Sequence, residues 1–428
     1  MHKHTKKRKA FIFTLFYPYL HQGVSYDPYV ASEVETLARG FDTVDVISLC
    51  AGHDGQLEIP ANVNVTNLHL QLNLIDKLSS VLLPFKAYFR EELKGLEAYD
   101  RQIDLKLLKA IAIYAVRAEK YKAFLEGLLK KMDFNEYDVV IYSYWNFEYA
   151  LAAALLKQKY PVKIVTRNHS LDLYFERMPE NYQPFKRFVF KQSDLFVIIS
   201  QQGLKYFIER HRIPPAEQGK IFLNRVGMEN HLPIYTHNYE KIVLLSNAWI
   251  QPLKRIDLLI KSLALINDIP IEWIHIGDDY GTSRMPGIMA LAETYLKDKP
   301  NIRYEFAGRK NMEGIFEIYQ ARKVDLFINL STTEGIPVSM MEALSFGVPI
   351  IGTSVGGVPE IVEDKVNGFL FPVEVSAQHA ADGISAFFRL PAMQRDKLSA
   401  NARRIWDERF NAAKNSNYLL ERILSLYS

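Results

Sequence analysis

The stretch Glu334-Gly-Ile-Pro-Val-Ser-Met-Met-Glu342 decides the interpretation of the second half of this chain. The apolar run 325–330 precedes it, and Gly347 follows it. Proline is favoured at the first position of a helix and glycine just past its end. We therefore predict a strand, a loop, a helix over 338–346 with Pro337 at its first position, and a stop at Gly347.

This arrangement places two carboxylates around a helix start. Glu334 falls in the loop and Glu342 inside the helix, and the helix N-terminus between them offers unpaired N–H groups that suit phosphate. Carboxylates do not favour a loop flanked by Ile336, Val338 and Met340 unless they have partners. A ligand with both phosphate and hydroxyl groups, such as a nucleotide sugar, fits this pattern. The alternative is that both glutamates are solvated surface residues.

Composition bounds the class of protein. The chain has 428 residues, 48% of them hydrophobic, which is enough for a large core and two or three domains. With 52 Lys and Arg against 49 Asp and Glu, the net charge of +3 gives no drive toward nucleic acid. The single cysteine, Cys50, excludes an internal disulfide and fits a reducing compartment. No apolar stretch approaches the ~18–20 residues of a membrane span, so we expect a cytoplasmic protein that is soluble or peripheral on the inner face of the membrane.

Short apolar runs alternate with helical patterns in two series, which indicates two parallel sheets covered on both faces. The fold class is therefore α/β, with two doubly wound Rossmann-like domains. The strand-like runs of the first series are 10–16, 44–49, 139–142, 163–166 and 195–199, and those of the second are 241–246, 271–276, 302–306, 326–330 and 349–352.

The same alternation of strands and helices predicts the domain boundaries. We predict a basic leader over 1–9, a first domain over 10–228, a linker over 229–240, a second domain over 241–405 and a C-terminal helix over 406–428 that returns to the first domain. The leader is either a solubilising tail or a contact for anionic lipid. A helical insertion at about 72–132 contains the amphipathic segment 78–89, which Pro84 should kink or split. That segment either packs on the first domain or lies on a membrane surface.

Ligands of open α/β sheets bind outside the carboxyl ends of the strands, so the residues after each strand are the candidates. We expect the two domains to face a central cleft. Gly23 follows the first strand and would let backbone approach a phosphate. His169 follows the strand 163–166 and could bind a sugar hydroxyl or a developing charge.

Candidates of the second domain follow its strands in the same way. Lys254 and Arg255 precede a helix, where cations are poorly placed unless an anion lies between them. The turns that hold Gly277 and Arg309 suit a base or a ribose. We find no convincing metal-ligand spacing, no serine nucleophile elbow and no GxxxxGK[ST] loop.

Together these residues resemble the retaining glycosyltransferases of family four, which have the GT-B fold. The motifs that carry the resemblance are Glu334-x7-Glu342 with Gly335-Ile-Pro-Val338, Lys254-Arg-Ile-Asp-Leu-Leu259, Gly347-Val-Pro-Ile-Ile-Gly-Thr353 with Gly356-Gly357, and Glu363 with Asn367-Gly-Phe369. In the first domain, Tyr142-Ser-Tyr-Trp145 and Arg167-Asn-His169 look like the bacterial capsule and exopolysaccharide branch.

The resemblance implies roles for the residues at the matching positions. Glu334, His169 and Lys254 would be catalytic: Glu334 holds hydroxyls of the donor sugar, His169 contacts that sugar, and Lys254 neutralises the leaving diphosphate. Glu342 would bind the ribose, and no metal or other cofactor is implied. The remaining donor-binding residues would be Gly23 near the diphosphate, and Arg255, Gly277, Arg309, Gly335, Ile336, Pro337 and Val338.

The chain departs from the family pattern at two positions. Trp249 stands where the family often has Arg, and Arg255 replaces a common Gly. The second cation of the phosphate site then has three candidates, Arg255, Arg309 and Arg167.

The resemblance implies a retaining transferase that moves a sugar from a nucleotide diphosphate sugar to a glycan acceptor. We expect a lipid-linked acceptor in surface polysaccharide synthesis, peripheral contact with the membrane surface as a further partner, and no nucleic-acid partner. Two alternatives stay open. One is a sugar-nucleotide epimerase or hydrolase on the same fold, and the other is a non-catalytic nucleotide-sugar-binding subunit of a polysaccharide assembly complex.

Overall fold

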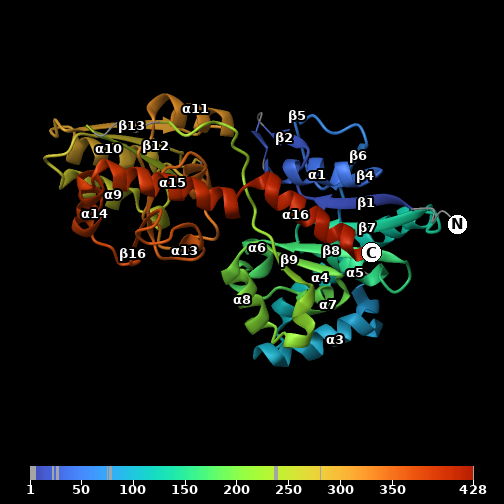
Figure 1. Cartoon of the computed structure of the whole chain (residues 1–428). Helices are drawn as coiled ribbons and strands as arrows, with labels where there is room; N and C mark the ends of the chain where they lie inside the picture. Colours follow the sequence, from blue (N-terminus) through green and yellow to red (C-terminus); the bar gives the residue numbers. More distant parts are fainter. Residues whose placement is uncertain are drawn as a thin grey trace. The chain divides into compact units, whose positions relative to one another are not determined.

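Two compact units make up the structure, a computed structural model that describes residues 6–21, 24–25, 28–74, 76, 80–235, 240–279 and 281–427. The first unit combines Met1–Val226 with Ala412–Ser428, and the second is Gly227–Asn411. Each is built on a parallel sheet with helices around it (Figure 1). The predicted α/β class with two doubly wound domains is confirmed.

The sheet of the first unit has the strand order β10-β9-β8-β7-β1-β4-β6, and every pairing is parallel. Its central strands are apolar and buried on both faces, as a sheet covered by helices requires. The order reverses between β1 and β7, which is the switch point of this sheet. The strands are β1 (Lys7–Thr14), β4 (Thr43–Ser48), β6 (Val63–Asn67), β7 (Tyr137–Ser143), β8 (Val162–Asn168), β9 (Leu195–Ile198) and β10 (Ile221–Leu223). A small antiparallel sheet adds β2 (Tyr19–His21), β3 (Val24–Ser25) and β5 (Gly55–Gln56).

The first strand begins earlier than predicted. We expected it at residue 10, after a basic leader, but β1 starts at Lys7, which pairs with Tyr137 of β7. Lys9 forms an ion pair with Asp45 of β4 at 2.8 Å. The last basic residues of the leader are therefore part of the sheet, because neighbouring carboxylates balance their charge. Residues 1–5 of the leader lie outside the described residues.

Helices of the first unit cover both the sheet and each other. Helix α1 (Pro28–Gly40) packs against α16 (Ala412–Leu424), and α5 (Glu148–Leu156) packs against α4 (Leu105–Leu129) and α7 (Lys186–Gln192). The other helical segments are α6 (Ser170–Leu173), η3 (Phe175–Arg177), α8 (Gln201–Arg210), η4 (Pro215–Lys220) and η6 (Ser425–Tyr427).

The predicted C-terminal helix over 406–428 is two helices. Helix α15 (Ala392–Arg409) belongs to the second unit and α16 to the first. The break falls at Phe410 and Asn411, where Phe410 is fully buried and its carbonyl accepts the N–H of Met228 at 2.9 Å. Burial of Phe410 anchors the end of α15, so the returning helix starts at Ala412 and not at residue 406.

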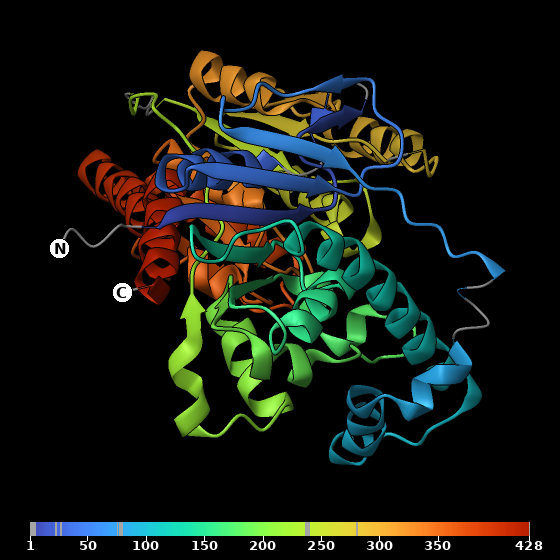
Figure 2. The same cartoon turned by 90° about the vertical axis from the view of Figure 1, so that its right-hand side faces the viewer.

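The segment between β6 and α4 is a chain of short helices at the edge of the first unit (Figures 1 and 2). It consists of η1 (Ser80–Phe85), α3 (Ala87–Gly95) and η2 (Leu96–Tyr99). Pro84 lies inside η1, and α3 begins three residues later, so the amphipathic segment is split as expected. Residues 78 and 79 lie outside the described residues. A buried cluster that includes Leu83, Phe89 and Phe185 fixes the segment on the first unit.

The second unit repeats the architecture with a six-stranded parallel sheet, order β13-β12-β11-β14-β15-β16. Numbered from its own first strand this is the order 3-2-1-4-5-6 of dinucleotide-binding folds, with the switch point between β11 and β14. The strands are β11 (Ile242–Asn247), β12 (Ile271–Ile276), β13 (Ile302–Gly308), β14 (Leu326–Asn329), β15 (Ile350–Thr353) and β16 (Gly368–Phe371). The helices are η5 (Pro252–Lys254), α9 (Ile256–Ala264), α10 (Met285–Leu296), α11 (Met312–Arg322), α12 (Val338–Ser345), α13 (Val358–Ile361), α14 (Ala377–Arg389) and α15.

Helices α10 and α14 pack against α9, and α12 packs against α15. The largest fully buried side chain of this unit is Trp273, in a cluster with residues of β11, β12 and α9. Among the helices of the described residues, we find none with the length and apolarity needed to pass through a membrane.

Candidate functional site

The switch point of the second unit carries two asparagines at strand ends. Asn247 ends β11 and Asn329 ends β14, and these strands are neighbours in the sheet, with Leu244 opposite Leu326. Parallel strands end at the same edge, so both amides lie where open α/β sheets bind ligands. Each amide holds one glutamate of the predicted pair.

Glu342 lies inside α12, as predicted, and accepts a hydrogen bond from Asn247 Nδ2 at 3.0 Å. Only 7% of the residue is exposed. Burial raises the pKa of Glu342 to about 7, although the bond from Asn247 pulls it the other way. A carboxylate accepts about four hydrogen bonds, and this one takes one from the described residues. The side chain therefore has capacity left for donors from a ligand.

Glu334 lies in the loop before α12 and receives two donors on one oxygen. Lys254 Nζ stands 2.6 Å from Glu334 Oε1, and Asn329 Nδ2 donates to the same oxygen at 2.9 Å. The Lys254 side chain is 20% exposed and that of Glu334 is 8% exposed. The structure thus brings two of the three predicted catalytic residues into contact, with Glu334 Oε2 left for a ligand.

A glycine pair fixes the loop that carries Glu334. Gly357 donates its N–H to Gly335 O at 2.7 Å. Gly356 adopts φ +53°, and a Cβ there would lie 1.9 Å from Glu334 O. A Cβ at Gly357 would lie 2.5 Å from Gly335 O, so both positions require glycine. The turn 354–357, which could pass for a tight connection in the sequence, holds the loop in place.

The start of α12 differs by one residue from the prediction. Pro337 has extended backbone, φ −73° and ψ 115°, and caps the helix, whose first residue is Val338. The helix ends at Ser345 and Gly347 follows with φ +71°, so the predicted glycine stop is confirmed. Gly335 and Ile336 lie in the loop between Glu334 and the cap.

Arg255 shapes the turn before α9. Its φ is 49°, where the family often has Gly, and its Nε and Nη1 donate to Leu330 O at 2.5 Å and Val373 O at 2.7 Å. Two of its donor groups are therefore committed to backbone carbonyls of its own unit. It lines, with Lys254, a small cavity of about 10 Å³, and a larger one of about 600 Å³ adjoins the same turn. Its role as a phosphate cation stays a prediction.

Gly277 and Arg309 follow the next two strands of the sheet. Gly277 has φ +132°, its N–H donates to Gly308 O at 3.0 Å, and a Cβ would lie 2.1 Å from Ala248 O. This close approach explains the glycine without a ligand. Arg309 is exposed after β13. Gly23, the predicted phosphate contact of the first unit, lies outside the described residues.

His169 of the first unit caps the short helix α6 at the end of β8. The backbone N–H of His169 donates to Asp172 Oδ1 at 2.5 Å. The centroid of its ring lies 4.1 Å from that of Trp145 and 4.8 Å from that of Tyr144. Burial and the nearby charge of Arg167 hold the pKa of His169 well below its usual range, so the ring is neutral. Neither ring nitrogen has a hydrogen-bond partner among the described residues.

Two buried charged residues that the sequence did not reveal, Asp172 and Lys186, support this loop through the backbone of Asn146. Asp172 Oδ2 accepts the N–H of Asn146 at 2.6 Å, and Lys186 Nζ donates to the carbonyl of Asn146. Burial raises the pKa of Asp172 to about 6 and lowers that of Lys186 to about 8. The sequence signal for them is slight, since Lys186 and Arg187 stand among the apolar residues of 185–190.

Arg167 is not a phosphate cation. It is fully buried, and its Nη1 meets Glu33 Oε1 at 2.5 Å, while Tyr142 donates to the other oxygen of Glu33 at 2.7 Å. The guanidinium also bonds to Asn224. Its charge is neutralised inside the first unit, so one of the three candidates for the second cation is removed. Within the described ranges, no group of three or more His, Cys, Asp or Glu residues is placed to hold a metal ion.

Two family models match the chain. The model of glycosyl transferases group 1 covers residues 228–405, and that of glycosyltransferase family 4 covers residues 112–220. A subunit of the UDP-N-acetylglucosamine–peptide N-acetylglucosaminyltransferase of Streptococcus agalactiae, GtfA, is 24% identical over 68% of this chain and 56% of its own length. The putative colanic acid biosynthesis glycosyltransferase WcaL of Salmonella typhimurium is 26% identical over 58% of this chain and 61% of its own length. The chain thus spans little more than half the length of these curated relatives.

Solved structures share the fold. The structure of HepE from Anabaena in complex with UDP-glucose matches with a TM-score of 0.59 and 17% identity, over 97% of this chain and 99% of that one. The family 4 model lies in the first unit and the group 1 model in the second, where it covers the switch point that holds Glu334, Glu342 and Lys254. The chain belongs to the glycosyltransferases of family four, with the GT-B fold.

Proposed function

We propose that this protein transfers a sugar from a nucleotide diphosphate sugar to a glycan acceptor, with retention of anomeric configuration. One observation carries the proposal. At the switch point of the second unit a buried carboxylate, Glu342, lies inside α12, and Glu334 of the loop before α12 forms an ion pair with Lys254 of η5. That set provides acceptors for hydroxyl groups and a cation for phosphate within one sheet edge.

Glu342 suits a ribose. Its pKa of about 7 means that the free site holds a carboxyl group that is partly protonated near neutral pH. The two hydroxyls of a ribose would donate to the ionised form, replace lost solvation and lower that pKa. Glu334 would take hydroxyls of the donor sugar on Oε2, which receives no donor among the described residues.

Lys254 would act on the leaving group. In transfer with retention, the bond between the anomeric carbon and the diphosphate oxygen breaks, the acceptor oxygen bonds to the same face, and the acceptor proton passes to the departing phosphate. Negative charge develops on the diphosphate, and a cation held in advance by Glu334 stabilises it without reorganisation. His169, being neutral, would contact the sugar by hydrogen bonding and not by charge.

The donor and acceptor classes rest on relatives. The HepE complex contains UDP-glucose, which favours a uridine diphosphate donor for this chain. WcaL is named for colanic acid biosynthesis, which favours a polysaccharide product for this chain, and we propose a lipid-linked acceptor for it. Exposed Val81, Leu82 and Phe85 of η1, beside Lys86, are the proposed contact with the inner face of the membrane.

A transfer assay with paired variants tests the proposal. Lys254→Ala and Glu334→Ala should abolish acceptor-dependent release of nucleotide diphosphate while the circular dichroism spectrum stays that of the folded chain. Lys261→Ala is the matched control, since Lys261 only pairs with Asp257 on the surface of α9 at 3.4 Å. Near-normal turnover in either site variant would exclude the assignment. Turnover of donor without acceptor would favour the epimerase or hydrolase alternative. Trp249, at the usual Arg position and 48% exposed, favours the non-catalytic subunit, which would bind donor without turnover.

A further inference from the structure

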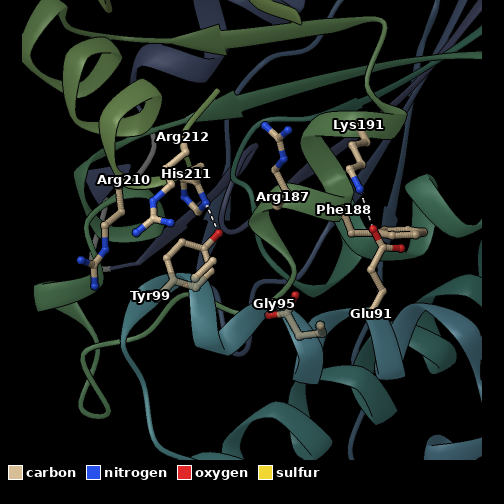
Figure 3. Close-up of a pocket in the computed structure, with 11 residues that line it drawn as sticks. Glu91, Gly95, Tyr99, Arg187, Phe188, Lys191, Arg210, His211 and Arg212 are labelled. Carbon is tan, nitrogen blue, oxygen red and sulfur yellow. Dashed lines mark hydrogen bonds and ion pairs between the residues drawn. The ribbon is translucent and has the colours of Figure 1, made fainter. Parts of the chain in front are cut away.

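A second cavity lies in the first unit, and none of the candidate site residues lines it. It is enclosed by α3 and η2 on one side and by α7 and the end of α8 on the other, with a volume of about 210 Å³ (Figure 3). Its charged and titratable lining residues are Tyr99, Arg187, Lys191, Arg210, His211 and Arg212, together with the carboxylates Glu91 and Glu92.

Three successive residues, Arg210, His211 and Arg212, reach this cavity where α8 ends. Arg212 has φ 48°, a left-handed conformation that non-glycine residues adopt rarely, and the turn keeps its side chain on the cavity. His211 is 5% exposed, whereas Arg212 is exposed and Arg210 half-buried. The end of the helix therefore presents a buried imidazole between two cations.

A hydrogen bond fixes the tautomer of His211. Tyr99 Oη lies 2.6 Å from His211 Nδ1. Burial raises the pKa of Tyr99, so the phenol keeps its proton and donates it to Nδ1. Burial and the charges of Lys186, Arg187 and Arg210 lower the pKa of His211 to about 3, so the ring is neutral. Nε2 then carries the ring hydrogen, and it meets no acceptor among the described residues.

Two arginines that line the same cavity also have buried N–H groups that donate no hydrogen bond to the described residues. Arg187 donates from Nη2 to Glu217 Oε1 at 3.1 Å, but its Nη1 is buried with no partner in the described part of the chain. The Arg210 guanidinium lies over the Phe175 ring at 4.5 Å, and its Nε is likewise buried and unpaired in that part. Stacking uses the face of a guanidinium and leaves its in-plane N–H groups free. All the unpaired buried polar atoms of the lining are donors, so the missing group is an acceptor.

The charges of the residues that line the cavity also favour an anionic ligand. Lys191 is paired with Glu91 at 2.6 Å, and Arg187 with Glu217. No carboxylate of the described residues pairs with Arg210 or Arg212. Glu92 is occupied by Tyr182 Oη at 2.7 Å and Phe185 N–H at 2.6 Å, and burial raises its pKa to about 7. The cavity therefore has an excess of positive charge.

We propose that this cavity binds a phosphate monoester group. Donors from α7 and from the end of α8 line it, and a tetrahedral dianion offers more acceptor positions and more charge than a carboxylate. The volume admits a phosphate with a small organic body. The group can come from a soluble phosphorylated compound or from the headgroup of an anionic lipid, because η1 of the same segment exposes Val81, Leu82 and Phe85.

The full chain is titrated with inorganic phosphate and with glycerol 3-phosphate, and binding is measured by calorimetry and by the shift in thermal unfolding. Both ligands should bind, and Arg210→Gln and Arg212→Gln should each weaken binding about tenfold. Lys191→Gln, which removes a cation already paired with Glu91, is the matched control and should bind as the parent does. Lys254→Gln separates this site from any phosphate held by the second unit.

Two outcomes overturn the proposal: the absence of binding at millimolar phosphate, or binding that both arginine variants leave unchanged. His211→Phe provides a further variant that adds no charge change and should also weaken binding. Vesicles distinguish the sources of the group. Arginine-dependent capture by phosphatidic acid and not by phosphatidylcholine identifies a lipid headgroup, and arginine-dependent binding of glycerol 3-phosphate without capture identifies a soluble ligand.

Discussion

Replacement of Glu342 by Gln should change how the stability of the second unit depends on pH. The pKa of Glu342 rises from 4.5 to about 7 on folding, mainly because the carboxyl group is buried. A raised folded-state pKa means that the contribution to stability is complete below pH 4.5 and is lost as the pH rises through 7. With 1.36 kcal/mol per pKa unit, ionisation costs roughly 3 kcal/mol in full, of which about 2.5 kcal/mol falls between pH 5 and pH 8.

Urea unfolding at both pH values, followed by tryptophan fluorescence, measures this difference, since Trp249, Trp273 and Trp406 belong to the second unit. The Gln side chain keeps the size of Glu342 and can still accept from Asn247, so any cost of its amide is independent of pH. The parent should lose about 2.5 kcal/mol more than Glu342→Gln between pH 5 and pH 8. Glu313→Gln, on the exposed start of α11, should have the same free energy of unfolding as the parent at both pH values. Equal pH dependence in Glu342→Gln and the parent would refute the reasoning.

Other perturbations follow from single contacts. Gly356→Ala places a Cβ 1.9 Å from Glu334 O at φ +53° and should cost at least about 2 kcal/mol and most of the transfer activity. Gly287→Ala, inside α10 with open space around its Cβ, should not destabilise; equal unfolding midpoints would contradict this. Glu33→Gln leaves the fully buried Arg167 without its charge partner and should destabilise the first unit by about 3–5 kcal/mol, seen as a lower urea midpoint. Nucleotide affinity should fall by up to about tenfold per pH unit below pH 7, because binding favours ionised Glu342, and a calorimetric pH series on Glu342→Gln should be flat.

The sequence predicted the parts of the site that follow from strand ends and helix signals. Glu334 in a loop, Glu342 in a helix and Lys254 before a helix are all confirmed, because proline and glycine mark the ends of α12 and apolar runs mark the strands. Contact between Lys254 and Glu334, 80 residues apart in the sequence, could not be deduced from spacing. It depends on which strands are neighbours in the sheet, and that order becomes visible only in the structure.

Partner residues were missed for a different reason. Asn247 and Asn329 stood at predicted strand ends, where an asparagine is equally typical of an ordinary turn. Lys186 stands beside Arg187 among aromatic residues, and only its bond to the buried carbonyl of Asn146 and the nearby charge of Asp172 explain it. Arg255 was assigned to an anion because of its charge, and that role stays a prediction. Its left-handed backbone and its bonds to two carbonyls become visible only in three dimensions.

The architecture of the two domains was predicted more completely than the ends of individual strands and helices. Two doubly wound domains follow from the alternation of strands and helices, which is a long-range pattern. The start of β1 at Lys7 and the break at Phe410 depend on single tertiary contacts, the pairing of Lys9 with Asp45 and the burial of Phe410. Local patterns of charge and helical period favoured a leader and one continuous helix at these places.

The nucleotide site of the second unit is the central claim, and calorimetric titration with uridine, guanosine, adenosine and cytidine diphosphates, without divalent metal, tests it most directly. One of them, with uridine diphosphate expected from the HepE complex, should bind the parent and the Glu313→Ala control alike and should lose that binding in Glu342→Ala. Failure of all four to bind, or binding that Glu342→Ala leaves intact, would contradict the account.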